Sequence, residues 1–263
     1  MSVFLICLMS NIKTAEEIEV LREAGRRLAR VMEELRKAVR PGISTFELDA
    51  LGEKLIRDGG DTPAFKNYKP QGARIAFPAT VCISINNEAV HGIPKKERTL
   101  ETGDIVSLDA GLIHQGLISD MCITVPVGAI DATAHTLIET TREALMAGIA
   151  AARGGAQTGD IGAAIEKVIS GSGFAIVKEL GGHGVGHNVH EEPHIAHFGK
   201  QGTGKMLLPG MVITIEPTIS EGTGEVLLGK DRFTYETVDG ARTAQFEHTI
   251  VITDGEPEIL TVV

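Results

Sequence analysis

Five acidic or imidazole side chains interrupt stretches of the sequence that are otherwise apolar or rich in glycine. They are Asp109 at the end of IVSLD, Asp120 within GLISDMCITV, His183 within GGHGVGH, Glu216 at the end of VITIE, and Glu247 before HTIVIT. Burying an ionised carboxylate without a partner is costly, and the candidate cations near these segments are Arg232 and Arg242. Four carboxylates and one imidazole suit a pair of divalent metal ions better than structural zinc, which prefers thiolate and imidazole ligands. The sequence therefore predicts that these five residues converge on two divalent ions.

Two of the carboxylates lie in segments whose side chains should alternate between the two faces of a strand. This alternation places Thr214 on the same face as Glu216, and Gln245 on the same face as Glu247. Pro217 favours an extended backbone at Glu216, as expected at the end of a strand.

Two further histidines are candidates for contacts with a substrate. His91 lies in NEAVHGIP and His190 lies in HNVHEEPH. A positioned imidazole can donate a hydrogen bond to a developing oxyanion or to the scissile nitrogen. The other histidines give no such indication: His187, His194 and His197 are expected to be structural or surface residues, His248 should face away from Glu247, and His114 and His135 stand in no supporting pattern.

The elements that must position these residues can be read from hydrophobic periodicity and from capping signals. Thr14 and Glu17 form a capping-box pattern that opens a helix ending near Val39, and Ser44 opens a second helix that ends at Gly59. We also expect a strand over 80–86, strands at 105–109 and 116–127 that form a hairpin, helices over 132–152 and 158–169, and strands with glycine-rich turns from 177 onward.

An internal similarity suggests two related halves. The segment that begins GISTFEL at Gly42 resembles GAQTGDI at Gly155, 113 positions later. Such a repeat favours a duplicated α/β unit with a site at the seam, although two ordinary capped helices would also look alike. No linker-like composition separates the halves, so residues 12–263 are expected to form one catalytic domain. A more typical start at Met9, MSNIKT, favours the interpretation that residues 1–11 are an N-terminal extension from an upstream start.

Composition narrows the class of protein. The 263 residues are 43% apolar and carry a formal net charge of −10, which argues against nonspecific nucleic-acid binding. The apolar run at 3–9 is too short to span a membrane. The three cysteines, Cys7, Cys82 and Cys122, favour a reducing cytoplasm, and nothing in the sequence requires more than a monomer.

The motifs resemble those of type I methionine aminopeptidases, which have the pita-bread fold. The resemblance runs from about Ile12 to Thr261 and rests on CISINNEAVHGIP, GDIVSLDAG, GGHGVGHNVHEEP, LPGMVITIEP and AQFEHTIVITDGEPEIL. The order Asp, Asp, His, Glu, Glu is shared with related pita-bread peptidases, whereas HGIP and HEEP are more specific to the methionine aminopeptidases. The resemblance implies an α+β fold in which two pseudo-symmetric α/β halves surround a curved antiparallel sheet, with the metal site at its centre.

The resemblance also implies a role for each matched metal ligand. Asp109 would chelate one ion, and Asp120 and Glu247 would bridge both. His183 would bind the second ion, with Glu216 as a further ligand. The two ions, drawn from cobalt, manganese, iron or zinc, would activate a water molecule as the nucleophile.

The remaining implied roles belong to catalysis on a peptide. His190 would help to stabilise the tetrahedral oxyanion, His91 would assist near the leaving nitrogen, and Glu216 would shuttle the proton. The substrates would be peptides and nascent chains with an N-terminal methionine, which would place the protein near the ribosome.

Some positions differ from the family pattern. Ile75 stands where many members have a histidine, within the altered segment QGARIAFP at 71–78, and Gly111, Met121 and Val189 also depart from the usual residues. The alternatives to methionine removal are therefore a paralogous aminopeptidase of altered specificity, an X-Pro peptidase, and a peptide-binding protein that has lost catalysis. HGIP argues against X-Pro cleavage, and the intact set of five ligands argues against loss of catalysis.

Overall fold

The computed structural model describes residues 12–69 and 75–263, so the extension expected at 1–11 and part of the segment at 71–78 lie outside the described residues. Its helices are α2 (Ala15–Ala38), α3 (Thr45–Asp58), α4 (Ala132–Ala151) and α5 (Thr158–Ile169), within a residue of the ranges expected from the sequence. Capping boxes at Thr14 and Ser44 open α2 and α3, as predicted. In each box a side-chain oxygen and a glutamate satisfy backbone N–H groups that would otherwise lack partners.

The central hairpin is longer than the sequence pattern indicated. Strand β4 (Ile105–His114) continues for five residues beyond Asp109 and pairs along its whole length with β5 (Leu117–Pro126). The prediction that a strand ends at Asp109 was therefore wrong, because Ala110–His114 continues in register to a tight turn. That turn is made by Gln115 and Gly116, both with positive φ, which matches the right-handed twist of the flanking strands.

These two strands belong to a nine-stranded sheet with the order β1-β4-β5-β14-β9-β7-β8, in which β2 also pairs with β4 and β15 with β14. Two small three-stranded sheets, β13-β10-β6 and β11-β12-β3, complete the strands. The remaining bounds are β1 Thr62–Pro63, β2 Val81–Ile85, β3 Glu88–Val90, β6 Ala175–Ile176, β7 Gly181–Gly184, β8 Glu191–Ala196, β9 Val212–Ile215, β10 Thr218–Ser220, β11 Val226–Leu228, β12 Tyr235–Thr237, β13 Thr243–Gln245, β14 Glu247–Val251 and β15 Glu258–Ile259. Every pairing is antiparallel, so the α+β class expected from the sequence is confirmed.

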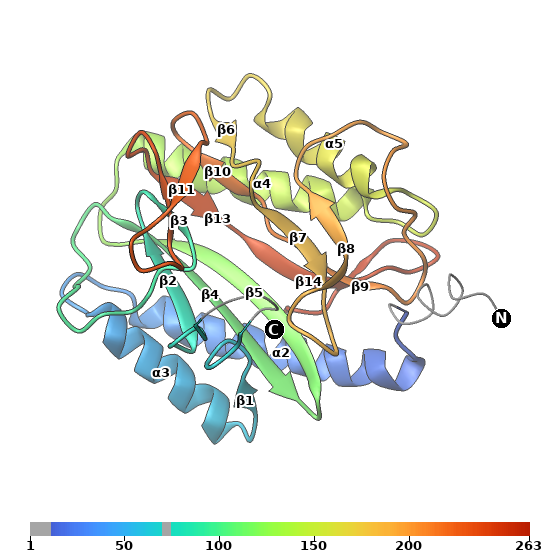
Figure 1. Cartoon of the computed structure of the whole chain (residues 1–263), viewed down its shortest axis with the longest axis horizontal. Helices are drawn as coiled ribbons and strands as arrows, with labels where there is room; N and C mark the ends of the chain where they lie inside the picture. Colours follow the sequence, from blue (N-terminus) through green and yellow to red (C-terminus); the bar gives the residue numbers. More distant parts are fainter. Residues whose placement is uncertain (1–11, 70–74) are drawn as a thin grey trace.

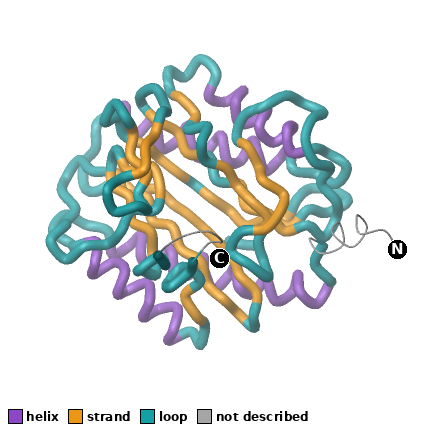
Figure 2. The backbone as a smooth tube through the Cα atoms, viewed as in Figure 1, coloured by secondary structure: helices purple, strands orange, loops and turns teal. Residues whose placement is uncertain are grey.

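The helices form two pairs, α2 with α3 and α4 with α5, which lie below and above the strands in the view of Figure 1 (Figure 1; Figure 2). Helices α3 and α5 begin at Thr45 and Thr158, 113 positions apart, so the internal similarity in the sequence corresponds to equivalent helices. Each pair has its own apolar core, one around Leu28 and Leu108 and the other around Leu145 and Ile213. Within residues 12–69 and 75–263, no helix has the length and apolar character required to span a lipid bilayer.

Strand alternation decides which residues of the hairpin face the helices. Val106, Leu108, Ala110 and Leu112 of β4 pack against α2 and α3 in the apolar core. The residues between them, including Asp109, must then project from the opposite side of the sheet. This side is where the candidate site forms.

Helix α2 packs so closely on the chain end that only glycine fits at position 25. A Cβ atom at Gly25 would lie 2.3 Å from the carbonyl oxygen of Leu260. Alanine is normally favoured over glycine inside a helix by about 1 kcal/mol, but overpacking costs about 1–3 kcal/mol.

We expect Gly25→Ala to lower the free energy of unfolding in urea by about 1–2 kcal/mol, because the clash is with backbone that cannot move aside. The exposed Glu34→Ala on the same helix serves as control and should change it by less than about 0.5 kcal/mol; equal stability of Gly25→Ala and wild type would contradict this packing.

Candidate active site

Three adjacent strands, β4, β5 and β14, bring Asp109, Asp120 and Glu247 together. In the β2-β4-β5-β14 part of the sheet, Asp109 stands opposite Cys82 on one side and Cys122 on the other, and Cys122 in turn stands opposite Glu247. Asp120 lies opposite Gly111, two residues further along the same face. The side chains of Asp120 and Glu247 are almost fully buried, at 3% and 2% exposure.

His183 of β7 and Glu216, which follows β9, reach the same place and are held there by one threonine. The Thr214 hydroxyl donates to Glu216 Oε1 at 2.9 Å and accepts from the His183 backbone N–H at 3.1 Å. The Gln245 amide donates to Glu216 Oε2 at 3.2 Å. These contacts confirm that Thr214 shares a face with Glu216.

The tautomer of His183 is fixed by its backbone contact. Nδ1 lies 2.9 Å from the carbonyl oxygen of Gly184, and because a carbonyl oxygen can only accept, Nδ1 must carry the hydrogen. Nε2 is then left with its lone pair, 3.4 Å from Glu216 Oε1. A neutral imidazole with one nitrogen anchored in this way is the usual form of a metal-ligating histidine.

The donor set fits divalent cations. Ligand atoms of Asp120, His183 and Glu247 all lie within 4.8 Å of one another. Asp109 Oδ1 and Asp120 Oδ1 are buried and have no hydrogen-bond partner among the described residues. Arg242, one of the two cations considered from the sequence, pairs instead with Asp131 and Glu221. Among the residues that the structure describes, no Lys or Arg forms an ion pair with these carboxylates, and such a cluster requires protons or metal ions to be stable.

Burial and mutual repulsion shift the pKa values of these groups. Burial raises the pKa of Asp109 to about 7. Burial and the Asp109 charge raise the pKa of Glu216 to about 8. Burial, with repulsion from neighbouring carboxylates, holds the pKa values of Asp120 and Glu247 well above their ordinary values. Burial lowers the pKa of His183 to about 3, so this imidazole is neutral at pH 7 and free to ligate a metal ion.

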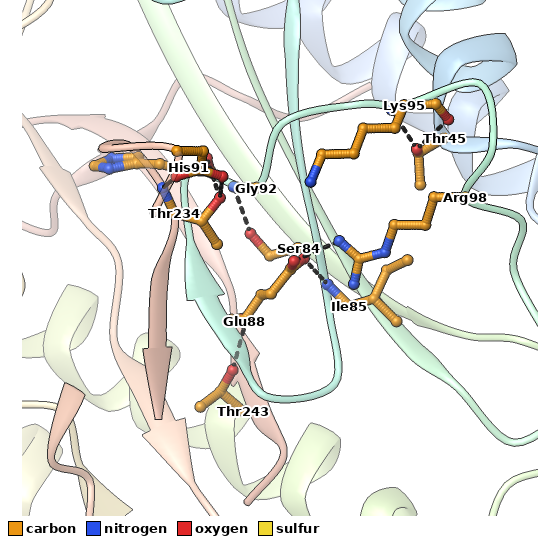
Figure 3. A network of polar contacts seen from close by, with 11 residues as sticks. Thr45, Ser84, Ile85, Glu88, His91, Gly92, Lys95, Arg98, Thr234 and Thr243 are labelled. Atoms are coloured by element: carbon orange, nitrogen blue, oxygen red, sulfur yellow. Dashed lines mark hydrogen bonds and ion pairs between the residues drawn. The ribbon is translucent and has the colours of Figure 1, made fainter. Parts of the chain in front are cut away.

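His91 lies at the edge of the same pocket in an unusual backbone conformation. Its φ is +58°, in the left-handed region that a non-glycine residue adopts only when its neighbours hold it there. Its carbonyl oxygen accepts from the Thr234 hydroxyl at 3.4 Å, and the following Gly92 N–H donates to Ser84 Oγ at 3.1 Å (Figure 3). Loss of solvation in the pocket lowers the pKa of the His91 imidazole to about 4, which leaves it neutral at pH 7.

The turn and the short strand β3 that lead into His91 are fixed by Glu88. The Glu88 carboxylate accepts from the Ile85 N–H at 3.0 Å and pairs with Arg98, while its carbonyl oxygen accepts from Thr243 Oγ1 at 3.1 Å (Figure 3). These bonds tie the turn to two neighbouring segments, so the position of His91 is determined by contacts distant in sequence.

His190 lies next to His183, with ring centroids 4.5 Å apart. The turn that carries it is anchored by Glu191, whose carboxylate accepts from the Asn188 N–H at 2.8 Å and pairs with the buried Lys13 at 2.7 Å. The five predicted metal ligands and both substrate-contact histidines therefore line one pocket.

The rest of the pocket wall is apolar, and most of it was not identified from the sequence. Four aromatic residues line it, Phe65, Tyr68, Phe77 and Phe233, together with Cys82 and Val189. Phe233 forms part of this wall, whereas Tyr235 lies outside it and packs edge-on against His91. The chain has just eight phenylalanines and two tyrosines. The aromatic residues of FKNY, before the altered segment at 71–78, and of AFP, at its end, could therefore have been identified from the sequence as wall residues.

The other histidines lie where the sequence placed them, outside the set of ligands. His197 is fully buried and its Nε2 accepts from the Glu216 backbone N–H at 3.3 Å, so it supports the site from behind. His248 Nδ1 contacts Thr261 Oγ1 at 2.8 Å, away from Glu247 as expected, and His114 pairs with Asp61 at 2.7 Å.

The positions that differ from the family pattern have different consequences. Met121 faces the α2 side of the sheet, in the apolar core, and so does not contact the acidic cluster. Ile75 is 44% exposed. At Gly111 a Cβ atom would lie 3.0 Å from the ring of Phe65, so the missing side chain lets this aromatic wall residue lie directly against β4.

Comparison with known proteins matches this geometry to one family. Residues 19–254 match metallopeptidase family M24. The chain belongs to metallopeptidase family M24. Methionine aminopeptidase 1 of Bacillus subtilis is 43% identical over 249 residues, which cover 95% of this chain and 98% of that protein. Among solved structures, methionine aminopeptidase from Thermotoga maritima has a TM-score of 0.91 at 40% identity, covering 96% of this chain and 99% of that chain.

The chain also has more distant structural relatives. A prolidase from Pyrococcus furiosus has a TM-score of 0.79 at 25% identity and covers 98% of this chain, but only 67% of the prolidase chain. Both kinds of relative confirm the pita-bread fold implied by the sequence motifs. The M24 chain described here spans nearly the full length of its methionine aminopeptidase relatives.

The acidic cluster makes the stability of the metal-free protein depend on pH. The folded-state pKa values of Asp109 and Glu216 lie near 7 and 8, above the value of about 4 expected in the unfolded chain. Protonation therefore favours the folded state; this stabilisation is fully present below about pH 4 and is lost as the pH rises to the folded pKa values. We expect Tm in a chelator to fall between about pH 4 and pH 8, with Glu247→Gln giving a shallower fall because one repelling carboxylate is gone. Added manganese should make Tm rise with pH, since ligands must be deprotonated to bind the metal. A Tm that does not change with pH in the chelator would contradict the raised pKa values.

The hydroxyl of Thr214 should matter for metal affinity although it is not itself a ligand. Thr214→Val keeps the shape but removes the donor to Glu216 and the acceptor for the His183 N–H. Losing such supporting contacts costs about 10–100-fold in metal affinity, which calorimetric titration with manganese would measure. Thr218→Val is the matched control, because its buried hydroxyl has no hydrogen-bond partner among the described residues. Equal affinities of the two variants would show that Thr214 does not orient the site.

Proposed function

We propose that this M24 protein is a metal-dependent aminopeptidase that removes methionine from the amino terminus of peptides and nascent proteins. The observation that carries this proposal is a buried cluster of four carboxylates and one neutral imidazole that opens into a pocket with aromatic walls. The cluster provides hydrolytic chemistry, and the apolar wall provides a place for one unbranched apolar side chain. The chain is 43% identical to a protein named methionine aminopeptidase 1, which supports the same activity.

The proposed cofactor is a pair of divalent cations per chain. Asp109, Asp120, His183, Glu216 and Glu247 would hold them, and the buried, unpartnered oxygens of Asp109 and Asp120 support this assignment. When bound, the cations would lower the pKa of a water molecule and polarise the carbonyl of the first peptide bond. Carboxylate-rich sites accept cobalt, manganese, iron or zinc, and availability selects among them.

The side chains of the protein would supply the proton transfers. Glu216, held by Thr214 and Gln245, is the proposed acceptor of the proton from the attacking water and its donor to the leaving amine. His190 would donate a hydrogen bond to the oxygen of the scissile carbonyl, and His91, which lines the same pocket, would contact the leaving nitrogen. Loss of solvation in the pocket lowers the pKa values of both imidazoles, so each acts as a neutral hydrogen-bond donor.

The methionine side chain is proposed to lie against Phe65, Phe77, Val189 and Phe233. The rings of Phe77 and Phe233 meet edge to face, with centroids 5.4 Å apart. A thioether makes favourable contacts with aromatic rings and adapts to an irregular cavity. Cys82 lies at the inner end of this wall, where burial keeps its pKa well above the ordinary value and its thiol uncharged.

The extent of the catalytic domain, the oligomeric state and the location of the protein are proposed from the same role. Residues 12–263 are proposed to act as one catalytic domain, as a monomer in the cytoplasm, with access to chains emerging from the ribosome. An X-Pro peptidase is disfavoured because the prolidase relative is 25% identical to this chain, whereas methionine aminopeptidase 1 of Bacillus subtilis is 43% identical. A peptide-binding protein without catalysis is disfavoured because all five proposed ligands face one pocket.

Release of methionine from Met-Ala and Met-Gly peptides by the purified protein would test the proposal. We expect release with manganese, cobalt or iron(II), and loss of activity together with lowered metal content in Glu247→Gln, since a neutral amide is a weaker ligand than a carboxylate. Unfolding in urea would confirm that this variant still folds. Absence of release with every metal would overturn the proposal, and cleavage of Leu- or Pro-containing peptides in place of methionine peptides would favour the altered paralogue or the X-Pro peptidase.

A further inference from the structure

The hydroxyl of Tyr68 contacts the histidine proposed to bind the substrate carbonyl. Tyr68 Oη lies 2.9 Å from His190 Nδ1, with ring centroids 5.5 Å apart. Tyr68 is one of two tyrosines in the chain. The contact joins residues 122 positions apart in sequence, so it exists only because the fold brings the two segments together.

The backbone around Tyr68 holds the ring in place. The Tyr68 N–H donates to the carbonyl oxygen of Phe65, and the Tyr68 carbonyl accepts from the Phe77 N–H, both at 2.8 Å. The neighbouring Asn67 adopts a positive φ of +68° and donates to the Phe77 carbonyl oxygen, also at 2.8 Å. Tyr68 is thus fixed on both sides by pocket-wall residues, and its hydroxyl is directed at His190 by structure that does not depend on a ligand.

A hydrogen bond at Nδ1 decides what Nε2 can do. A neutral imidazole carries one hydrogen, so its two nitrogens cannot both donate. If Nδ1 donated to the tyrosine oxygen, Nε2 would present a lone pair, which would repel a carbonyl oxygen that is becoming negative. If the tyrosine donates to Nδ1, Nε2 carries the hydrogen and can donate it to that oxygen. Burial raises the pKa of Tyr68 above its usual value, which keeps the hydroxyl protonated and able to donate.

We propose that Tyr68 is a positioning residue that donates its hydroxyl hydrogen to His190 Nδ1 and thereby holds His190 as the Nε2–H tautomer facing the scissile carbonyl. This inference rests on the proposed peptidase function. It assigns to the Tyr68 hydroxyl a part in the rate of the reaction that is separate from any contact of its ring with the methionine side chain.

The Tyr68→Phe variant separates the two contributions, because it keeps the ring and removes the hydroxyl. With the manganese-loaded full-length enzyme and a Met-Ala peptide, we expect kcat to fall about five- to tenfold, the effect of one lost hydrogen bond. KM should stay within about twofold, because the apolar wall is unchanged. Tyr235→Phe is the matched control: Tyr235 does not line the pocket, and its hydroxyl makes no side-chain hydrogen bond among the described residues. A rise in KM alone, or a kcat equal to that of wild type, would overturn the proposal.

A second measurement does not depend on activity. Nitrogen-15 NMR of histidine-labelled, zinc-loaded protein reports which ring nitrogen of His190 carries the hydrogen, with the signal assigned from a His190→Asn sample. We expect the Nε2–H tautomer in wild type and in Tyr235→Phe, and a mixture of tautomers in Tyr68→Phe. The Nδ1–H tautomer in wild type, or the same tautomer in all three proteins, would refute the role of Tyr68. This result is independent of whether methionine is released, so failure of the proposed function and failure of this inference can be told apart.

Discussion

The structure depends on burying four carboxylates in one place. Asp109, Asp120 and Glu247 come from three strands and Glu216 directly follows a fourth, and each loses the solvation that keeps an ordinary carboxylate charged. Repulsion among them would separate the strands unless protons or divalent cations compensate. Much of the surrounding polar structure, including Thr214, Gln245 and His197, serves to hold these groups together.

The sheet and the two pairs of helices provide a rigid frame for this cluster. One face of the β4–β5 hairpin packs its aliphatic side chains against α2 and α3, while the other face presents Asp109 and Asp120. A similar helix pair, α4 and α5, packs against the strands that lead to Glu216 and Glu247. A site on paired strands with packed helices behind them is positioned more precisely than a site on loops. The ligands therefore sit at the seam between the two halves.

The two histidines proposed to contact the substrate are positioned differently from the proposed metal ligands. His91 directly follows the short strand β3 and His190 lies on a bend, so the backbone conformation of both is set by contacts with other segments. Glu88 with Arg98 fixes the approach to His91, and Glu191 with Lys13 fixes the turn that carries His190. The proposed substrate contacts thus lie in short segments that are each anchored by an ion pair.

The amino-acid sequence determined the helices, their caps and the identity of the five acidic and imidazole residues, because these follow from local periodicity and from the high cost of burying charge. It did not determine that β4 continues beyond Asp109, since an apolar run does not reveal where a strand ends until its partner is known. It also gave no means of pairing Tyr68 with His190 or of placing Phe65 against Gly111. Those contacts join segments far apart in the chain, and only the tertiary structure decides which distant side chains share one pocket.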